Sequence, residues 1–391
     1  MNALRTIEKI YKDLFEVEPI LVRSPGRLNL IGEHTDYNMG FVLPAAIDKA
    51  VYFAIAQRTD RTCKLVAADL HEEHEFTLDR IVKSEKGWPN YLMGVVDQLI
   101  KAGYNLKGFN CVFGGDIPIG AGLSSSAAIE AGLTFALNHL FNLEIDKLSL
   151  VKLAQKAENE FVGVNCGIMD QFINIFGEDQ HALCIDCRSL EYELVPFDYD
   201  HVSVVFFNTN VSHSLASSEY NLRREECTKG VEIIKKEFPA IRSLRDVQPE
   251  MLESFKTKME PLTYRRCKYV VDENERLLKA CDALKVHDLE SFGSLLYQTH
   301  EGLSRDYEVS CPELDFLVDE TKNIPAVYGA RMMGGGFGGC TINIIENEAV
   351  AEVTSLIAKK YKEKFNREAT VYVTKISAGT SIVSSEVNET V

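Results

Sequence analysis

The sequence predicts an α+β protein with two layered domains, and three observations support this. The chain has 391 residues, more than one hydrophobic core usually serves. Its first half alternates short apolar runs with helical patterns. Its second half is rich in helices and closes on a strand, a helix and a strand. We place the boundary near residues 198–201, which divides the chain into domains of 1–198 and 199–391.

The first domain is predicted to combine strands and helices in layers. Helical spacing of apolar residues begins at Leu4. Apolar runs predict strands at 19–22, 41–42, 50–57, 109–113 and 182–187, and a period near 3.6 predicts helices at 90–102, 125–141 and 147–161. Cys184 and Cys187, which follow His181, could suggest a zinc site, but no second ligand pair stands at zinc-finger spacing. A buried strand explains the segment more simply.

The second domain opens with an apolar strand and then becomes helical. The strand is expected at 202–208. Helices are expected at 219–238, 251–255, 264–284, 289–303 and 313–324, followed by a strand at 341–345, a helix at 350–365 and a strand at 369–373.

The composition excludes several classes of function. A formal charge of −16 argues against nucleic-acid and anionic-membrane partners, because both require a basic surface. The apolar runs are too short to span a bilayer, and the N-terminus lacks the apolar core of a signal peptide. Ten scattered cysteines are typical of reduced thiols. We therefore expect a soluble, cytoplasmic protein.

A glycine- and serine-rich segment, PIGAGLSSSAA at 118–128, leads into an alanine-rich helical pattern. Gly120 and Gly122 carry no side chains, so successive N–H groups can surround an anion at the start of the helix. Serine hydroxyls there can cap the helix or bind Mg²⁺. A plain loop with a serine cap is the alternative, but a cap needs one serine and three follow one another. The segment predicts a phosphate-binding loop.

Other nucleotide-binding machinery has no support in the sequence. The chain contains no G-x₄-G-K-[ST] motif and no HRD or DFG triplet, which excludes P-loop and protein-kinase sites. The glycines at 334, 336 and 339 have dinucleotide-fold spacing but lead into a strand rather than a helix. If the predicted phosphate-binding loop belongs to a kinase, that kinase is of a different class.

The segment PGRLNLIGEHTDY at 25–37 places a cation, two carboxylates and a histidine together. Such groups can exchange several hydrogen bonds with neighbouring hydroxyls, as sugar recognition requires. A solvated polar turn is the alternative, but it accounts poorly for the apolar LNLIG residues. The segment predicts a sugar-binding site.

These motifs resemble the GHMP small-molecule kinases and, within them, the galactokinase family. The resemblance covers nearly the whole chain and rests on the segments at 25–37 and 118–128 and on GARMMGGGFGGC at 329–340. The segments CGIMDQ at 166–171 and SEYN at 218–221 also look like galactokinase segments. The EHTD sequence distinguishes galactokinase-like members from mevalonate and homoserine kinases.

The resemblance implies a fold, an activity and a set of site residues. The fold is an N-terminal domain like domain 2 of ribosomal protein S5 and a C-terminal α/β sandwich, with the active site between them. The activity is transfer of the γ-phosphoryl group of ATP to galactose, with Mg²⁺ as cofactor, by a monomer. The implied galactose contacts are Glu33, His34, Thr35, Asp36, Gly167 and Tyr220. The implied ATP contacts are Gly120, Ala121, Gly122, Leu123, Ser124, Ser125 and Ser126, with Trp88 and Tyr91 near the adenine. Ser126 and Glu158 are implied to serve Mg²⁺.

The mechanism is expected to centre on an ion pair between Arg27 and Asp170. Phosphoryl transfer requires an aligned acceptor, a proton sink and positive charge near the transferred group. We expect Asp170 to accept the proton of the C1 hydroxyl while Arg27 stabilises the transition state. The alternative is that Asp170 only orients the hydroxyl, because a loosely bonded transition state needs little help from a base.

Two other functions compete with galactose phosphorylation. One is a catalytically inactive sensor of galactose and ATP, although the phosphate-loop motif, Arg27 and Asp170 are all intact. The other is a GHMP kinase for another sugar, such as N-acetylgalactosamine. The sequence does not give the space beside the C2 hydroxyl on which this choice depends.

Overall fold

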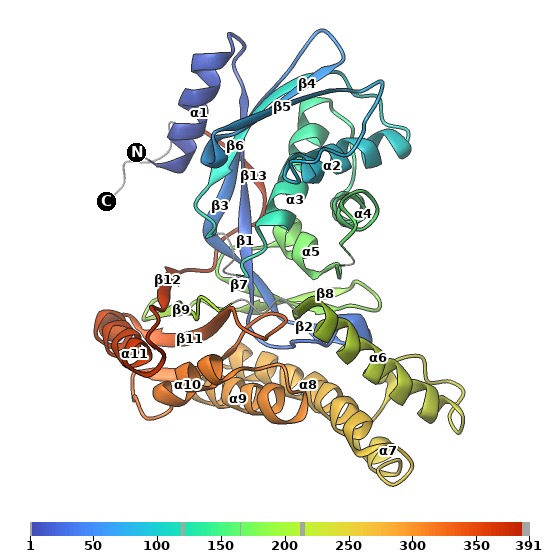
Figure 1. Ribbon diagram of the computed structural model, residues 1–391, viewed down its shortest axis with the longest axis vertical. Helices are drawn as coiled ribbons and strands as arrows, with labels where there is room; N and C mark the ends of the chain where they lie inside the picture. The colour runs from blue at the N-terminus through green and yellow to red at the C-terminus, as the bar shows by residue number, and fades with distance from the viewer. Residues whose placement is uncertain (1, 119–121, 165, 212–215, 385–391) are drawn as a thin grey trace.

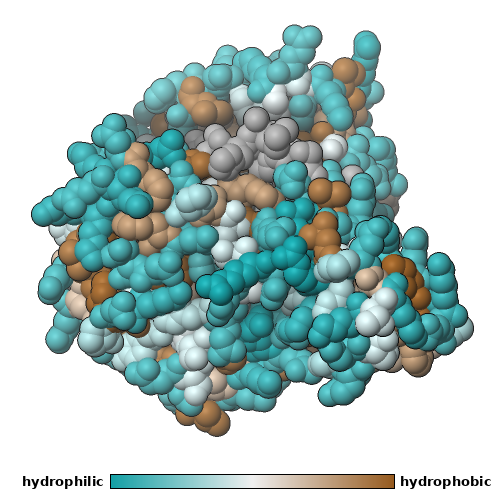
Figure 2. All heavy atoms as spheres, turned by 60° about the horizontal axis from the view of Figure 1, so that its bottom comes forward, coloured by the Kyte–Doolittle hydropathy of each residue, from teal (hydrophilic) through white to brown (hydrophobic). Residues whose placement is uncertain are grey.

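The computed structural model describes residues 2–118, 122–164, 166–211 and 216–384, with the side chains of 216–218 omitted. The chain forms two layered parts stacked end to end, joined by a small sheet between them (Figure 1). Within the described residues, no helix is long and apolar enough to cross a membrane. The face drawn in Figure 2 is mostly hydrophilic, and its hydrophobic residues lie in separate patches.

The N-terminal part is built on a six-stranded sheet. The strand order is β13 (Ser381–Val383), β1 (Ile20–Asn29), β3 (Pro44–Gln57), β6 (Phe109–Gly115), β4 (Thr62–Ala67) and β5 (Glu72–Thr77). Successive side chains of a strand point to opposite faces. Phe53 and Ile55 accordingly join the main core, whereas Ala54 and Ala56 pack with Tyr11 of α1 (Ala3–Leu14).

The main-core face of this sheet is covered by helices. They are α2 (Pro89–Lys101), α3 (Ser125–Leu140), α4 (Lys147–Lys156) and α5 (Met169–Phe176) (Figure 1). Helix α3 packs directly on β1 and β3. The predicted helix at 147–161 is α4 continued by a π-helical turn, Ala157–Val162, which carries the buried Glu158.

The C-terminal part has a four-stranded antiparallel sheet. Its order is β10 (Val327–Met332), β11 (Cys340–Glu346), β9 (Val202–Asn208) and β12 (Thr370–Thr374). Every residue of β9 is buried, because both faces are covered. Val205 and Phe207 pack with α10 (Pro312–Thr321) and α11 (Val350–Phe365). Val204 and Phe206 share the main core with α8 (Pro261–Lys285) and α9 (Leu289–Glu301).

The remaining elements join these two parts. Strands β2 (Phe41–Val42), β7 (His181–Asp186) and β8 (Tyr192–Pro196) form the small sheet. Leu183 and Ile185 of β7 are fully buried, as the predicted strand requires, whereas Cys184 is only partly buried and Cys187 follows the end of the strand. Helices α6 (Ala216–Lys235) and α7 (Pro249–Glu253) extend on one side of the C-terminal part (Figure 1).

The C-terminal end of the chain returns to the N-terminal sheet. Strand β13 pairs antiparallel with β1 at Leu21–Arg23. Before it, Arg23 donates to the carbonyl of Ala378 at 2.9 Å, and Thr380 lies 3.1 Å from the hydroxyl of Ser24. The predicted division at 198/199 remains a prediction, but residues 377–383 of the predicted second domain lie against the first. Sequence patterns could not reveal this long-range pairing.

The structure also contains elements that were not predicted. Strand β1 runs on through Arg27, so the first half of the sugar motif is strand rather than loop. Strand β5 was missed because its sequence, EEHEFT, is polar and lies at a sheet edge. Helix α5 was missed because its eight residues are too few for a clear helical period.

Candidate active site

A cavity of about 600 Å³ lies where β1, α5, α6 and the glycine-rich turn after β10 meet. Its lining combines carboxylates, one imidazole, one guanidinium and several glycines: Arg27, Gly32, Glu33, His34, Asp36, Val42, Gly163, Val164, Cys166, Gly167, Met169, Asp170, Tyr220, Asn221, Gly334, Gly335 and Gly336. Residues from four separate stretches of the sequence therefore surround one space.

Arg27 and Asp170 form a bidentate ion pair at this cavity. Arg27 Nε donates to Asp170 Oδ1 and Nη2 donates to Oδ2, both at 2.8 Å. A third nitrogen, Nη1, donates to the carbonyl of Gly122 at 2.5 Å. Arg27 follows a register shift in β1, and Asp170 occupies the first turn of α5. The ion pair expected from the sequence is thus present between two regular elements.

Ser124 links the phosphate-loop segment to this pair. It precedes α3 with a left-handed φ of 56°, and its side chain does not cap the helix. Its hydroxyl instead donates to Asp170 Oδ2. The Leu123 carbonyl accepts from the N–H of Arg27 at 3.1 Å. The phosphate-loop segment therefore lies directly against the Arg27–Asp170 ion pair.

Glu33 is held by groups from the third motif. Its Oε1 accepts from Arg331 Nη1 at 3.1 Å and from the N–H of Gly334 at 3.0 Å. Arg331 is fully buried and also donates to the carbonyls of Leu30, Met332 and Asn29. Sequence reasoning did not single out Arg331, although a lone cation within an apolar strand pattern was a usable signal.

His34 lies beside Glu33 in a left-handed backbone conformation, with φ of 62°. Its Nδ1 is 2.7 Å from the hydroxyl of Tyr37. Its Nε2 is buried and forms no hydrogen bond of ordinary length and angle among the described residues, although the backbone of Gly335 lies close enough to favour the charged ring. Burial lowers the pKa of His34 to about 4, against the opposing charge of Glu33, so the ring is neutral at neutral pH.

Asp36 and Gly167 form a close contact in the wall of the cavity. A Cβ atom at Gly167 would lie 2.5 Å from Asp36 Oδ2, so a larger residue there would require the Asp36 carboxylate to move. Burial raises the pKa of Asp36 to about 6, and the charges of Glu33 and Asp170 contribute in the same direction. Tyr220, which also lines the cavity, has its pKa raised by burial.

Thr35 does not line the cavity, unlike the other residues implied to contact galactose. It is fully buried, and its hydroxyl lies 2.9 Å from the carbonyl of Gly32 and 2.5 Å from that of Phe41. The side chain therefore holds the turn that presents its neighbours.

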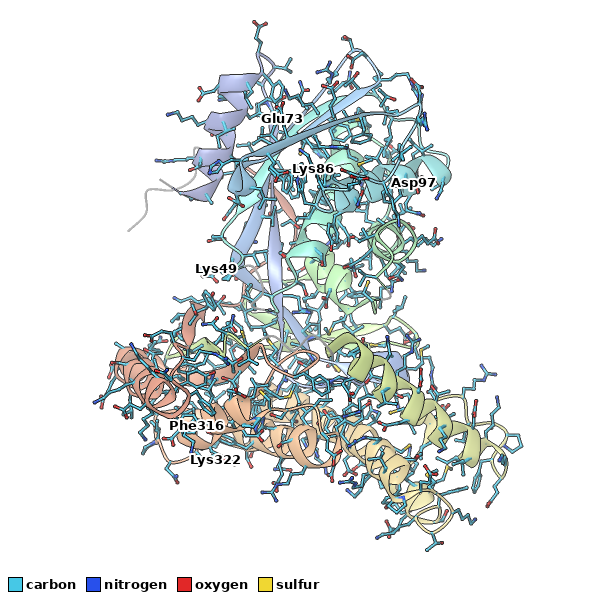
Figure 3. The ribbon with its side chains drawn as sticks, viewed as in Figure 1. Lys49, Glu73, Lys86, Asp97, Phe316 and Lys322 are labelled. Carbon is cyan, nitrogen blue, oxygen red and sulfur yellow. The ribbon has the colours of Figure 1, made fainter. Side chains whose placement is uncertain are left out.

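The implied ATP residues lie at the start of α3 and α2. Ser125 and Ser126 begin α3, and Gly122 has a φ of 73° that favours glycine. Gly120 and Ala121 lie outside the described residues. Trp88 directly precedes α2, where its Nε1 donates to Glu72 at 2.9 Å, and Tyr91 lies within the first turn of that helix. Lys86 and Glu73, labelled in Figure 3, both belong to the N-terminal part. The Lys86 ammonium donates to the carbonyl of Glu73 at 3.0 Å. Trp88 and Tyr91 do not line the cavity.

The implied Mg²⁺ ligand Glu158 lies in a buried polar cluster. Its Oε2 accepts from Gln171 Nε2 at 2.7 Å and from Cys166 Sγ at 3.2 Å. Burial and the charge of Glu158 raise the pKa of neighbouring Glu130 to about 10. No set of three or more His, Cys, Asp or Glu side chains that could hold a metal occurs in the described part of the chain. Mg²⁺ needs only one or two protein oxygens beside water and phosphate, so Glu158 and Ser126 suit it chemically.

Comparison with known protein families gives three matches along the chain. Residues 9–57 match the galactokinase galactose-binding signature, residues 90–178 match the GHMP kinases N terminal domain, and residues 277–363 match the GHMP kinases C terminal. The signature includes Arg27 and the residues from Glu33 to Asp36. The N-terminal match includes Ser124 and Asp170.

Individual proteins show the same similarity over the full chain. The galactokinase of Roseiflexus sp. (strain RS-1) is 45% identical over 360 residues, 92% of each chain. The galactokinase of Chloroflexus aggregans is 42% identical over 393 residues, covering both chains completely. The crystal structure of Lactococcus lactis galactokinase complexed with galactose superposes with a TM-score of 0.92 at 36% identity, covering 97% of this chain and 100% of that one. Methanococcus jannaschii mevalonate kinase, at 20% identity and a TM-score of 0.63, shares the fold.

Proposed function

Because this chain belongs to the galactokinase family of GHMP kinases, we propose that it transfers the γ-phosphoryl group of ATP to the C1 hydroxyl of α-D-galactose. The products are α-D-galactose 1-phosphate and ADP, and the reaction is the first committed step of galactose catabolism in the Leloir pathway. The observation that carries the proposal is the position of the Arg27–Asp170 pair. It lies against the phosphate-loop residues Gly122 and Ser124 and shares its cavity with Glu33, His34 and Asp36.

Galactose would occupy the cavity with its hydroxyls against both hydrogen-bond acceptors and hydrogen-bond donors. The carboxylates of Glu33 and Asp36 accept hydrogen bonds, and Tyr220 and Asn221 can donate them. Gly167 and Gly335 let the backbone approach the sugar closely. Thr35 supports the turn rather than touching the sugar, because its hydroxyl already lies against two carbonyls.

Asp170 would accept the C1 proton, and Arg27 would stabilise the transferred group. Asp170 Oδ2 accepts from Arg27 and Ser124, whereas Oδ1 accepts only from Arg27 and keeps a lone pair for the sugar hydroxyl. Arg27 has five N–H donors, and three are used in the structure. The other two can meet phosphate oxygens as negative charge develops.

The nucleotide would lie along the segment from Gly122 to Ser126, with the base toward Trp88 and Tyr91. Ser126 and Glu158 would hold Mg²⁺, which neutralises phosphate charge when bound. We also propose a cytoplasmic monomer. None of the ten cysteines, all of them among the described residues, forms a disulfide bond, as expected in a reducing compartment. On the face drawn in Figure 2, the hydrophobic patches are separate from one another.

The test is ADP release from the purified protein with Mg-ATP and, in parallel, galactose, glucose, N-acetylgalactosamine and no sugar. The proposal predicts strong dependence on galactose. Turnover only with N-acetylgalactosamine would support the proposed phosphoryl transfer but contradict galactose as the acceptor. Binding of galactose and ATP without turnover would favour the sensor.

A further inference from the structure

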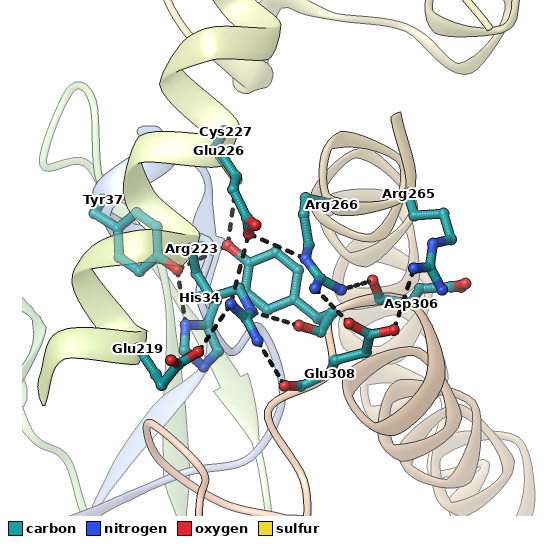
Figure 4. Close-up of polar contacts among 11 residues, drawn as sticks. His34, Tyr37, Glu219, Arg223, Glu226, Cys227, Arg265, Arg266, Asp306 and Glu308 are labelled. Carbon is teal, nitrogen blue, oxygen red and sulfur yellow. Dashed lines mark hydrogen bonds and ion pairs between the residues drawn. The ribbon is translucent and has the colours of Figure 1, made fainter. Parts of the chain in front are cut away.

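His34 lies at one end of a hydrogen-bonded chain of hydroxyl and thiol groups (Figure 4). Its Nδ1 is 2.7 Å from the Tyr37 hydroxyl, which is 2.8 Å from the Tyr307 hydroxyl. The Tyr307 hydroxyl is in turn 3.2 Å from Cys227 Sγ. These hydrogen bonds link the segment at 25–37 to the residue that follows the π-helical turn Gly302–Asp306, and then to α6. Neither tyrosine lines the cavity.

Two buried arginines fix the far end of this chain. Arg223 of α6 donates from Nε to the carbonyl of Tyr307 at 2.7 Å and from Nη2 to the carbonyl of Glu308 at 2.8 Å. Arg266 of α8 donates to the carbonyl of Asp306 at 2.5 Å and to the Glu308 carboxylate at 2.6 Å (Figure 4). The backbone on both sides of Tyr307 is therefore held, and its hydroxyl has a defined position.

The hydrogen bonds along this chain can run in two directions. If His34 Nδ1 carries the proton, it donates to Tyr37, Tyr37 donates to Tyr307, and Tyr307 donates to Cys227. If His34 Nδ1 is bare, Tyr37 donates to it, Tyr307 donates to Tyr37, and Cys227 can donate to Tyr307. The neutral ring has only one proton, so the direction decides whether Nε2 has an N–H.

The second direction is favoured by acceptor strength and by distance. An imidazole nitrogen accepts a hydrogen bond better than a phenol oxygen or a thiol sulfur does. When the phenol O–H of Tyr37 points at Nδ1, the best acceptor among these four side chains accepts a hydrogen bond. In the reverse direction, Nδ1 donates and no imidazole nitrogen accepts a hydrogen bond from them. The 2.7 Å separation is at the short end for an N–H donor and ordinary for an O–H donor.

We propose that Tyr37, oriented by Tyr307, is a positioning residue that fixes His34 as its Nε2–H tautomer and so makes it a hydrogen-bond donor to a galactose hydroxyl. This inference rests on the proposed function for the identity of the sugar. The carboxylates of Glu33 and Asp36 can only accept, so a hydroxyl beside them can donate to a carboxylate and accept from His34. A sugar lacking that hydroxyl leaves the buried N–H without a partner.

The tautomer can be read without any reaction. In ¹H–¹⁵N long-range correlation spectra of the free protein with labelled histidine, assigned through His34→Ala, we expect Nδ1 of His34 to be bare and Nε2 protonated. A protonated Nδ1 would overturn the inference. Because no sugar or ATP is present, this result is independent of whether the protein phosphorylates galactose.

Tyr37→Phe removes the hydroxyl while keeping the ring. We expect a mixture of His34 tautomers in the same spectra and a rise in the galactose KM on the order of tenfold with kcat within about twofold. Tyr297→Phe is the matched control, because its hydroxyl bonds Thr321 outside the cavity lining, and it should change neither readout. An unchanged tautomer and KM in Tyr37→Phe would contradict the inference.

Sugar analogues give a test on the unaltered protein. Fluorine accepts a hydrogen bond weakly and donates none, so we compare deoxy and deoxyfluoro galactose at each ring position. We expect one position at which the fluoro sugar has a several-fold higher kcat/KM than the deoxy sugar, a difference that disappears in His34→Ala. If no position shows such a His34-dependent difference although galactose is phosphorylated, the donor role is wrong and the proposed function stands.

Discussion

The two sides of the cavity are built differently. Arg27 and Asp170, which would carry the phosphoryl-transfer chemistry, lie on a central strand and in the first turn of a helix, within the N-terminal part. Glu33 and His34, which would recognise the sugar, lie in the turn after that strand, where groups from the C-terminal part hold Glu33. Tyr269 of α8, for example, donates to the carbonyl of Glu33 at 3.0 Å.

This difference suggests a division of labour. Groups on regular elements of one core are positioned by that core, so the ion pair should keep its geometry when the C-terminal part changes. The sugar-binding side depends on contacts between the two parts. Variants of the phosphoryl-transfer side, here called the first side, should therefore change kcat. Variants of the sugar-binding side, the second side, should change galactose KM or the stability of the protein.

The largest effect should come from Asp170→Asn, which tests the first side. The amide cannot take the C1 proton, so we expect kcat to fall by on the order of 10² to 10⁴ with little change in galactose KM. Steady-state kinetics measures this, with the exposed Asp179→Asn as control. A loss below tenfold would mean that Asp170 only orients the hydroxyl.

Arg331→Met tests how far the second side depends on the C-terminal part. The change removes the cation that pairs with the buried Glu33. It also removes the donors to the carbonyls of Leu30 and Asn29. We expect the free energy of unfolding to fall by about 3–5 kcal/mol, measured by urea denaturation. Arg367→Met, at a more exposed ion pair with Glu313, should cost less than about 1 kcal/mol. Equal losses in the two variants would refute the dependence.

Gly167→Ala sharpens the comparison within the second side. The new Cβ would displace the carboxylate of Asp36, so we expect galactose KM to rise on the order of tenfold while kcat changes less. Gly335→Ala is the comparison, since its Cβ would meet the Tyr220 ring at an ordinary 3.5 Å, and its KM should rise less. A drop in kcat alone for Gly167→Ala would place this glycine on the chemical side.

The smallest effect is a pH dependence from Asp36. Its pKa of about 6 in the fold lies above the ordinary 3.8, because burial disfavours the charged form. Its contribution to stability is therefore full below pH 3.8 and is lost as the pH rises through about 6. Asp36→Asn should lack this loss, so its Tm relative to the wild type should be higher at pH 8 than at pH 4. An unchanged Tm difference between the two pH values would contradict the raised pKa.

Much of the site was predictable because its motifs are short and chemically distinctive. The resemblance to galactokinases is confirmed by the family matches and the full-length relatives. The apolar periodicity located β9, α3 and α8 because these elements are long or fully buried. The Arg27–Asp170 pair was expected and is present, whereas its catalytic role stays a prediction.

The rest depends on contacts that no local pattern encodes. The pairing of β13 with β1 joins residues at the two ends of the chain. The resemblance implied that Thr35 contacts galactose, but the fold places its hydroxyl against the carbonyls of Gly32 and Phe41. Arg331 was visible as a residue, but its partner Glu33 lies about three hundred positions away. Such roles follow from tertiary structure.

The position of the phosphate on the product tests the central claim most directly. After reaction with galactose and Mg-ATP, ³¹P NMR of the sugar product should show a phosphate on the anomeric oxygen in the α configuration. A phosphate on any other hydroxyl would contradict the account, because it would require a different part of the sugar to face Asp170 and Arg27.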